Sequence, residues 1–140
     1  MGTLNFQTGR KTYTVNGGCE ISFDPADIGF VNRLFDLFGK LEKQHDEQPQ
    51  NAEDVFAYAV KKDKEMRAEI DALFGEPVCD KIFGSVNVLS PSGGLPVAMN
   101  FLLALIDEVD AASEAETKPS ARVDAYIQKY EKKYGKYVKK

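Results

Sequence analysis

The sequence contains one histidine, two cysteines and no tryptophan in 140 residues. Two cysteines are too few for a disulfide framework, and Cys19, Cys79 and His45 do not have the spacing of a zinc site. His45 stands in the polar segment KQHDEQ, so we expect it to be solvated. Cys19 alternates onto the apolar face of the predicted strands and Cys79 lies in a short predicted helix, which favours a core position for both over a reactive thiol. We therefore expect neither a metal site nor a nucleophile activated by histidine.

The sequence also lacks the GxxxxGK[ST] and GxGxxG loops that bind nucleotide phosphates. Gly93 and Gly94 are accordingly expected to form a turn, and no cofactor is expected. The longest apolar run, residues 95–106, is shorter than the ~20 residues of a membrane helix, and no signal peptide is apparent. These absences favour a cytoplasmic protein with no membrane span.

Carboxylates are abundant, and five of them cluster near residues 107–116. They could form a magnesium or acid–base site, but their place beside alanines at a helix end favours a solvated face. Asp63 lies within an apolar helical stripe, and Arg67 one turn later predicts an ion pair. We expect no catalytic residue and no enzymatic activity. The acidic cluster comprises Asp107, Glu108, Asp110, Glu114 and Glu116.

The length and the 43% hydrophobic content suit one folded domain with a substantial core. The net charge of −4 is unevenly distributed, since residues 118–140 hold eight basic and two acidic residues. That segment carries +6, which leaves −10 for residues 1–117. We predict a single compact domain over residues 1–117 and a separate basic segment over 118–140.

Residues from about 3 to 23 alternate apolar and polar side chains, which predicts three short antiparallel strands or a hairpin. A two-residue turn at residues 9–10 would place Phe6 opposite Tyr13 and Leu4 opposite Val15. A three-residue turn at residues 16–18 would keep the same face apolar. That face would comprise Leu4, Phe6, Tyr13, Val15, Cys19, Ile21 and Phe23.

Helical periodicity follows the strands, with Asp24 and Pro25 as start signals and Gly75 and Gly84 as stop signals. The fold class is α+β and predominantly helical, with a three-stranded meander or a hairpin packed against four to five helices. Helices are predicted over about residues 25–48, 51–74, 77–83 and 95–115, and a last one lies within 118–140.

Two segments are candidate contact surfaces. The apolar residues of helix 25–48 cover about half its circumference, more than the stripe of an ordinary surface helix. The candidate contacts there are Phe30, Leu34, Leu37 and Leu41.

The C-terminal segment 118–140 is predicted to form a basic amphipathic helix with a tyrosine stripe. It either packs on the domain or forms a detachable arm that binds a protein, a nucleic acid or an anionic membrane. The acidic remainder of the chain would repel the phosphate groups of a nucleic acid, so a protein partner is favoured over nucleic acid. The candidate contacts are Tyr126, Lys129, Tyr130, Lys133, Tyr134 and Lys136.

The order of parts resembles the tail-assembly-chaperone-like proteins of long-tailed phages and prophages of Gram-positive bacteria. The resemblance covers most of the chain and lies in KTYTVNGGCEISFDP, in IDALFGEPVCDKIFG with its two Phe-Gly phrases, and in KYEKKYGKYVKK. It implies a non-catalytic cytoplasmic protein that coats the helical tape-measure protein until tail-tube subunits replace it. A virion or tail subunit forming a homo-oligomer, and a nucleic-acid-binding module, remain alternatives.

Overall fold

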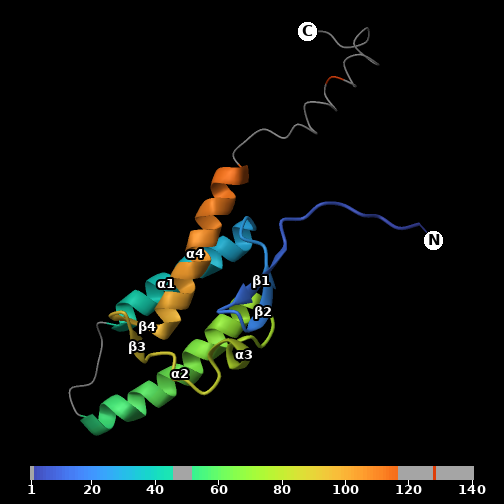
Figure 1. Ribbon diagram of the computed structural model, residues 1–140. Helices are drawn as coiled ribbons and strands as arrows, with labels where there is room; N and C mark the ends of the chain where they lie inside the picture. The colour runs from blue at the N-terminus through green and yellow to red at the C-terminus, as the bar shows by residue number, and fades with distance from the viewer. Residues whose placement is uncertain (1, 46–51, 117–127, 129–140) are drawn as a thin grey trace.

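The computed structural model describes residues 2–45, 52–116 and 128, and shows a predominantly helical α+β fold (Figure 1). The predicted fold class is confirmed, with two strands rather than three at the N-terminal end. In chain order the described elements are β1 (Lys11–Val15), β2 (Cys19–Phe23), α1 (Ile28–His45), α2 (Ala52–Phe74), α3 (Cys79–Phe83), β3 (Pro91–Ser92), β4 (Leu95–Pro96) and α4 (Val97–Glu116).

The hairpin formed by β1 and β2 has the register that the sequence predicts. Val15 lies opposite Cys19, and the remaining pairs follow in step. The turn between the strands requires left-handed backbone, which Asn16 and Gly17 supply with φ values of 51° and 71°. One face of the hairpin is therefore apolar, as the alternation predicts.

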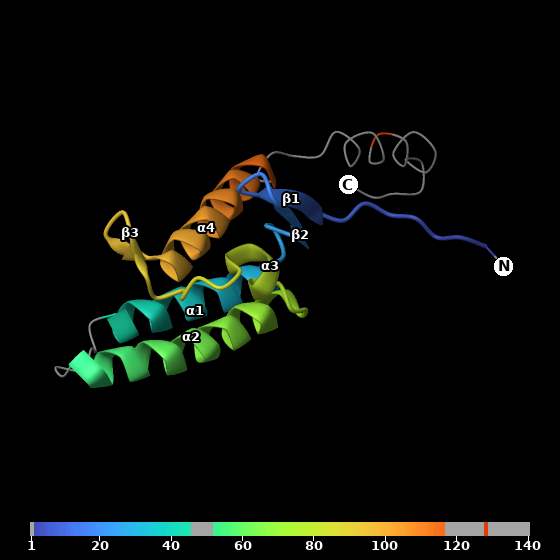
Figure 2. The ribbon, with the colours of Figure 1, turned by 60° about the horizontal axis from the view of Figure 1, so that its bottom comes forward.

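The first of the three predicted strands, around Leu4 and Phe6, is not formed. Residues 2–10 have no strand partner, and Leu4 and Phe6 are 87% and 76% exposed. The segment leads away from the body of the molecule (Figures 1 and 2). The prediction of a three-stranded meander within one chain is wrong.

The reason lies at the turn predicted for residues 9–10. The favoured two-residue hairpin turn has positive φ at both positions, but neither Gly9 nor Arg10 has a positive φ. Gly9 instead lies against the carboxylate of Asp24, where a Cβ on this residue would collide with a carboxylate oxygen. The backbone therefore passes Asp24 without reversing its direction.

Helix α1 begins later than the predicted residue 25. The Asp24 carboxylate accepts a hydrogen bond from the backbone N–H of Ala26 (2.9 Å), which forms a turn before the helix. Asp27 is the N-cap, and its carboxylate accepts a hydrogen bond from the N–H of Gly29 (3.1 Å). The two aspartates thus divide the turn and the cap between them.

The predicted stop signals after α2 and α3 are confirmed. Gly75 and Gly84 have φ values of 72° and 59°. At the end of α2 the N–H of Gly75 donates to the carbonyl of Ala72, and the N–H of Glu76 to that of Asp71. This pair of bonds is a Schellman motif, in which glycine adopts the left-handed conformation at low cost.

The helices enclose one hydrophobic core. Helix α1 lies between α2 and α4 in Figure 2 and contacts both of them. The hairpin and α3 lie against the end of the three helices at which the C-terminal half of α2 is found (Figure 2). The largest fully buried side chains of the core include Leu34, Met66, Ile70, Val78, Val88 and Leu102.

The segment after α3 ends in a short ladder, because β3 pairs with β4. Two backbone hydrogen bonds join this segment to the start of α4. The N–H of Val97 donates to the carbonyl of Ser90 (2.9 Å), and the N–H of Ala98 donates to the carbonyl of Val88 (2.8 Å). Helix α4 therefore begins after β4 rather than at residue 95.

Candidate functional site

The four α1 residues that the sequence indicates as partner contacts lie in the hydrophobic core. Phe30, Leu34, Leu37 and Leu41 are 4%, 0%, 8% and 3% exposed. Because α1 lies between α2 and α4, its broad apolar arc is used for packing within the chain. The structure corrects the prediction that these residues form a contact surface.

The other six predicted contacts, all within residues 118–140, lie outside the described residues. They are Tyr126, Lys129, Tyr130, Lys133, Tyr134 and Lys136. For this segment, both a docked helix and a detachable arm remain open, and the protein partner remains a prediction.

An unbroken apolar segment, residues 55–60, forms the first turns of α2 and is exposed on its outer side. Phe56 is 74% exposed and Val60 is 56% exposed. On the inner side, Val55 and Tyr58 line a pocket of about 320 Å³, together with the end of α1 and the loop before α4. We call this segment and its pocket the α2 surface.

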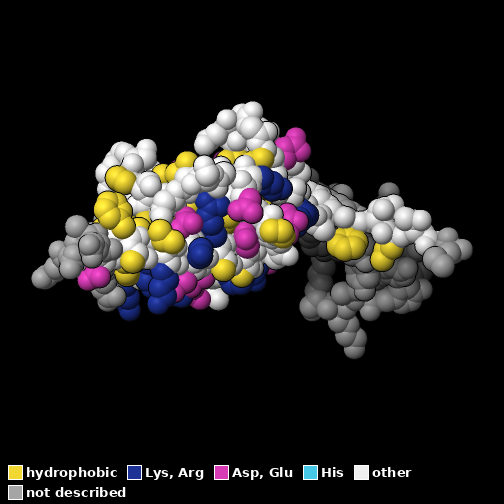
Figure 3. Space-filling model, turned by 90° about the horizontal axis from the view of Figure 1, so that it is seen from below, with side chains coloured by type: hydrophobic (Ala, Val, Ile, Leu, Met, Phe, Trp, Pro, Cys, Tyr) yellow, Lys and Arg dark blue, Asp and Glu magenta, His cyan; other side chains and the backbone are white. Residues whose placement is uncertain are grey.

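Figure 3 shows apolar side chains gathered at the end of the molecule where α2 begins, with charged side chains interleaved further along. The helical spacing of the α2 residues predicts a buried stripe, but six consecutive apolar residues exceed one stripe. That excess was the sequence signal for an exposed apolar side.

A second and larger hollow, of about 600 Å³, lies between the hairpin and helices α3 and α4. We call it the hairpin groove. Tyr13 and Val15 line one wall, and Phe101 and Leu105 line the other. The Tyr13 hydroxyl is buried and has no hydrogen bond of normal geometry. Burial and the nearby Glu108 carboxylate raise the pKa of Tyr13, so its hydroxyl stays protonated at neutral pH. The groove is thus mainly apolar, with a protonated phenol in one wall.

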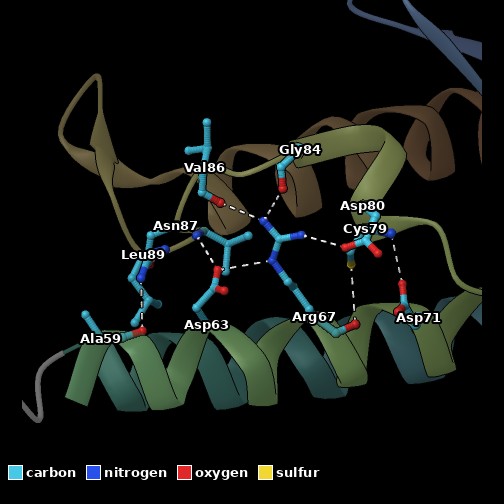
Figure 4. Close-up of polar contacts among 11 residues, drawn as sticks. Ala59, Asp63, Arg67, Asp71, Cys79, Asp80, Gly84, Val86, Asn87 and Leu89 are labelled. Atoms are coloured by element: carbon cyan, nitrogen blue, oxygen red, sulfur yellow. Dashed lines mark hydrogen bonds and ion pairs between the residues drawn. The ribbon is translucent and has the colours of Figure 1, made fainter. Parts of the chain in front are cut away.

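Arg67 on α2 holds α3 and the following loop in place (Figure 4). Its guanidinium donates to the carboxylates of Asp63 (3.2 Å) and Asp80 (3.1 Å). It also donates to the carbonyl oxygens of Gly84 (2.8 Å) and Val86 (2.7 Å). The predicted ion pair with Asp63 is confirmed, and it is one part of a larger network.

Two further α2 residues fasten the same loop. The carboxylate of Asp63 accepts a hydrogen bond from the N–H of Val88 (2.8 Å), and the carbonyl of Ala59 accepts one from the side-chain amide of Asn87 (3.1 Å). Each of these polar groups bonds to another part of the chain. The role we infer for the network is to position the loop, which in turn supports the start of α4.

Asp71 provides the cap that the short helix α3 lacks in its own sequence. Its carboxylate accepts hydrogen bonds from the N–H groups of Val78 and Cys79, both at 2.9 Å. Burial acts to raise the pKa of Asp71, but these hydrogen bonds and the nearby Arg67 outweigh it, and the pKa is lowered. The charged form of Asp71 is therefore stabilised by folding.

Asp71→Asn is expected to lower the free energy of unfolding by about 1–2 kcal/mol at neutral pH, because two charge-assisted hydrogen bonds become neutral. Since folding lowers the pKa of Asp71, its stabilisation is present above the unfolded-state pKa and is lost as the pH falls through the folded-state pKa. The difference between the two proteins should shrink below about pH 4 in urea unfolding. Asp110→Asn, at an exposed position, is the control. A difference independent of pH would contradict the assignment.

The thiol of Cys79 is buried and donates to the carbonyl oxygen of Arg67 (3.3 Å). Burial, followed by the adjacent Asp71, raises the pKa of Cys79 far above its ordinary value. The thiol stays protonated, so Cys79 is a core residue, as predicted. Cys19 on β2 is only partly buried, so the core position predicted for it is not confirmed.

The acidic residues predicted to form a solvated face on α4 are all exposed. Within the described residues, no three His, Cys, Asp or Glu side chains are grouped so that they could hold a metal ion. Gly93 and Gly94 form the turn between β3 and β4 with positive φ, as predicted. None of the described helices has the length and apolar character needed to cross a membrane.

Comparison with known proteins gives no relative from which to transfer a function. No protein-family description, curated protein or solved structure matches this chain. The α2 surface and the hairpin groove are thus assigned on their own geometry.

Proposed function

We propose that this protein is a non-catalytic assembly chaperone of the phage-tail type, which binds an apolar helical segment of a tape-measure protein in the host cytoplasm. The observation that carries the proposal is the exposed apolar side of α2 at Phe56 and Val60. A helix that is apolar on all sides is normally buried, so these turns have the composition of a covered helix.

A helix is the occupant that fits the α2 surface. Phe56 and Val60 are one turn apart and form an apolar ridge on the outer side of α2. Such a ridge along a helix matches the apolar stripe of a second helix. Lys61 and Lys64, exposed beyond the ridge, favour a partner with acidic residues beside its stripe.

We expect the double variant Phe56→Ser/Val60→Ser to lose this binding while keeping its fold, because both side chains are already exposed. The measurement is co-expression with the tape-measure protein of the same gene cluster, followed by co-purification. Native protein should keep the long partner soluble, and the double variant should reduce the recovered complex at least about 10-fold. Val86→Ser, at an exposed apolar loop residue, is the matched control.

Two outcomes would refute the proposal. The tape-measure protein could precipitate equally with and without this chain, or the double variant could bind as well as the native protein. Circular dichroism of the double variant separates lost binding from lost folding.

A structural tail subunit is the second candidate, and the projecting N-terminal segment with exposed Leu4 and Phe6 favours it. An extended segment with exposed apolar side chains is suited to adding a strand to the sheet edge of a neighbouring subunit. Mass spectrometry of purified particles distinguishes the two functions, since a chaperone is absent from the finished particle and a subunit is present.

A further inference from the structure

The N-terminal segment, residues 2–8, has the features of a strand without a sheet. It alternates Leu4 and Phe6 with polar residues, and it contains no charged side chain whose burial would be costly. Both apolar side chains are exposed, and Figure 3 shows apolar side chains on the segment that projects from the body. We call residues 2–8 the N-terminal arm.

The hairpin offers the arm a place to bind. Within the described residues, β1 pairs only with β2, so its other edge carries no strand. An open edge is a ready template for another strand. The apolar face beside this edge lines the hairpin groove through Tyr13 and Val15.

The register of that pairing follows from the apolar pattern. Antiparallel pairing with Phe6 opposite Tyr13 and Leu4 opposite Val15 would put all four side chains on the groove face. Within one chain this pairing needs a reversal at residues 9–10, and the backbone there does not reverse. Between two chains it needs no turn. A short hinge that resists closure favours exchange between copies.

We propose that two copies of this protein form a dimer in which each arm pairs with β1 of the other copy and its Leu4 and Phe6 enter the hairpin groove. The register is self-complementary, because residue 6 opposes residue 13 in both directions and a two-fold axis passes between Gly9 and Arg10. In this arrangement Arg10 of the second copy lies opposite Gly9, next to the Asp24 carboxylate that Gly9 already contacts. The two hairpins and two arms become one continuous sheet. The dimer does not involve the α2 surface and is independent of the proposed function.

Light scattering after gel filtration tests the dimer. The native chain should give twice its chain mass of 15.6 kDa. Leu4→Asp/Phe6→Asp should raise the dissociation constant at least ~100-fold and give the single-chain mass. Ile28→Asp, at a position that is 85% exposed on α1, is the control and should remain dimeric. A native protein that is monomeric, or an arm variant as dimeric as the control, would overturn the proposal.

Disulfide trapping tests the register. Thr8 and Lys11 oppose each other between copies in this arrangement, at Cβ separations that a disulfide can span. Thr8→Cys/Lys11→Cys, made with Cys19→Ser, should give a covalent dimer on a non-reducing gel after mild oxidation. Thr3→Cys/Lys11→Cys, which is out of register, should cross-link far less. A disulfide closed within one chain would show that the arm folds back on its own β1, and would overturn the exchange.

Discussion

Leu34→Ala is expected to lower the free energy of unfolding by about 2–5 kcal/mol, which is a large part of the stability of a domain of this size. Leu34 is fully buried in α1, where α2 and α4 pack on both sides. Truncation removes its apolar contacts and leaves a cavity that three rigid helices cannot easily close. Urea unfolding followed by far-UV circular dichroism measures the change.

The neighbouring residue supplies the control for this experiment. Phe35 is 47% exposed, so Phe35→Ala should cost less than about 1 kcal/mol although it removes a larger side chain. The comparison also separates the two interpretations of the apolar arc of α1. If Leu34 belonged to a partner surface, Leu34→Ala would weaken binding and leave unfolding almost unchanged.

Arg67→Ala is expected to cost about 2–3 kcal/mol and to release the loop after α3. The substitution removes donors from the carbonyl groups of Gly84 and Val86 and leaves Asp63 without its cation. Asp63 would still accept the hydrogen bond from Val88, so the loop should loosen first at its N-terminal half. Urea unfolding measures the stability, and limited proteolysis reports the loop.

Two variants make the Arg67 experiment specific. Arg67→Lys keeps the charge, but an ammonium group cannot reproduce a planar fork that reaches four partners, so most of the loss should remain. Lys61→Ala removes an exposed charge from the same helix and should change stability by less than about 0.5 kcal/mol. Native-like stability in Arg67→Lys would show that charge alone, rather than the hydrogen-bond geometry, holds the loop.

The sequence predicts this fold best where a local residue choice determines the backbone. Asn16 and Gly17 permit the left-handed turn that sets the hairpin register. Gly75 and Gly84 permit the left-handed backbone that ends two helices. These features depend on φ at single positions, so they are readable without knowledge of the tertiary structure.

The sequence is less informative where the answer depends on which elements meet. The apolar arc of α1 is correctly recognised, but amphipathicity does not say whether another chain or α2 and α4 will cover it. The arm has strand periodicity, yet pairing within the chain fails on the backbone at Gly9. The Arg67 network joins residues far apart in sequence, and only the Asp63 pair lies within helical reach.

The aromatic side chains of the core form a continuous series of ring contacts. The ring centroids of Tyr13 and Phe23 are 4.6 Å apart in a stacked arrangement, and those of Phe23 and Phe74 of α2 are 5.8 Å apart. The ring centroids of Phe74 and Phe101 of α4 are 6.1 Å apart, and those of Phe101 and Phe83 of α3 are 5.6 Å apart. Ring currents from this series should spread the NMR signals of nearby methyl groups over a wide range. A protein without tryptophan thus carries its own spectroscopic reporter, in which a ligand that moves the Tyr13 ring is detectable from methyl resonances in three helices.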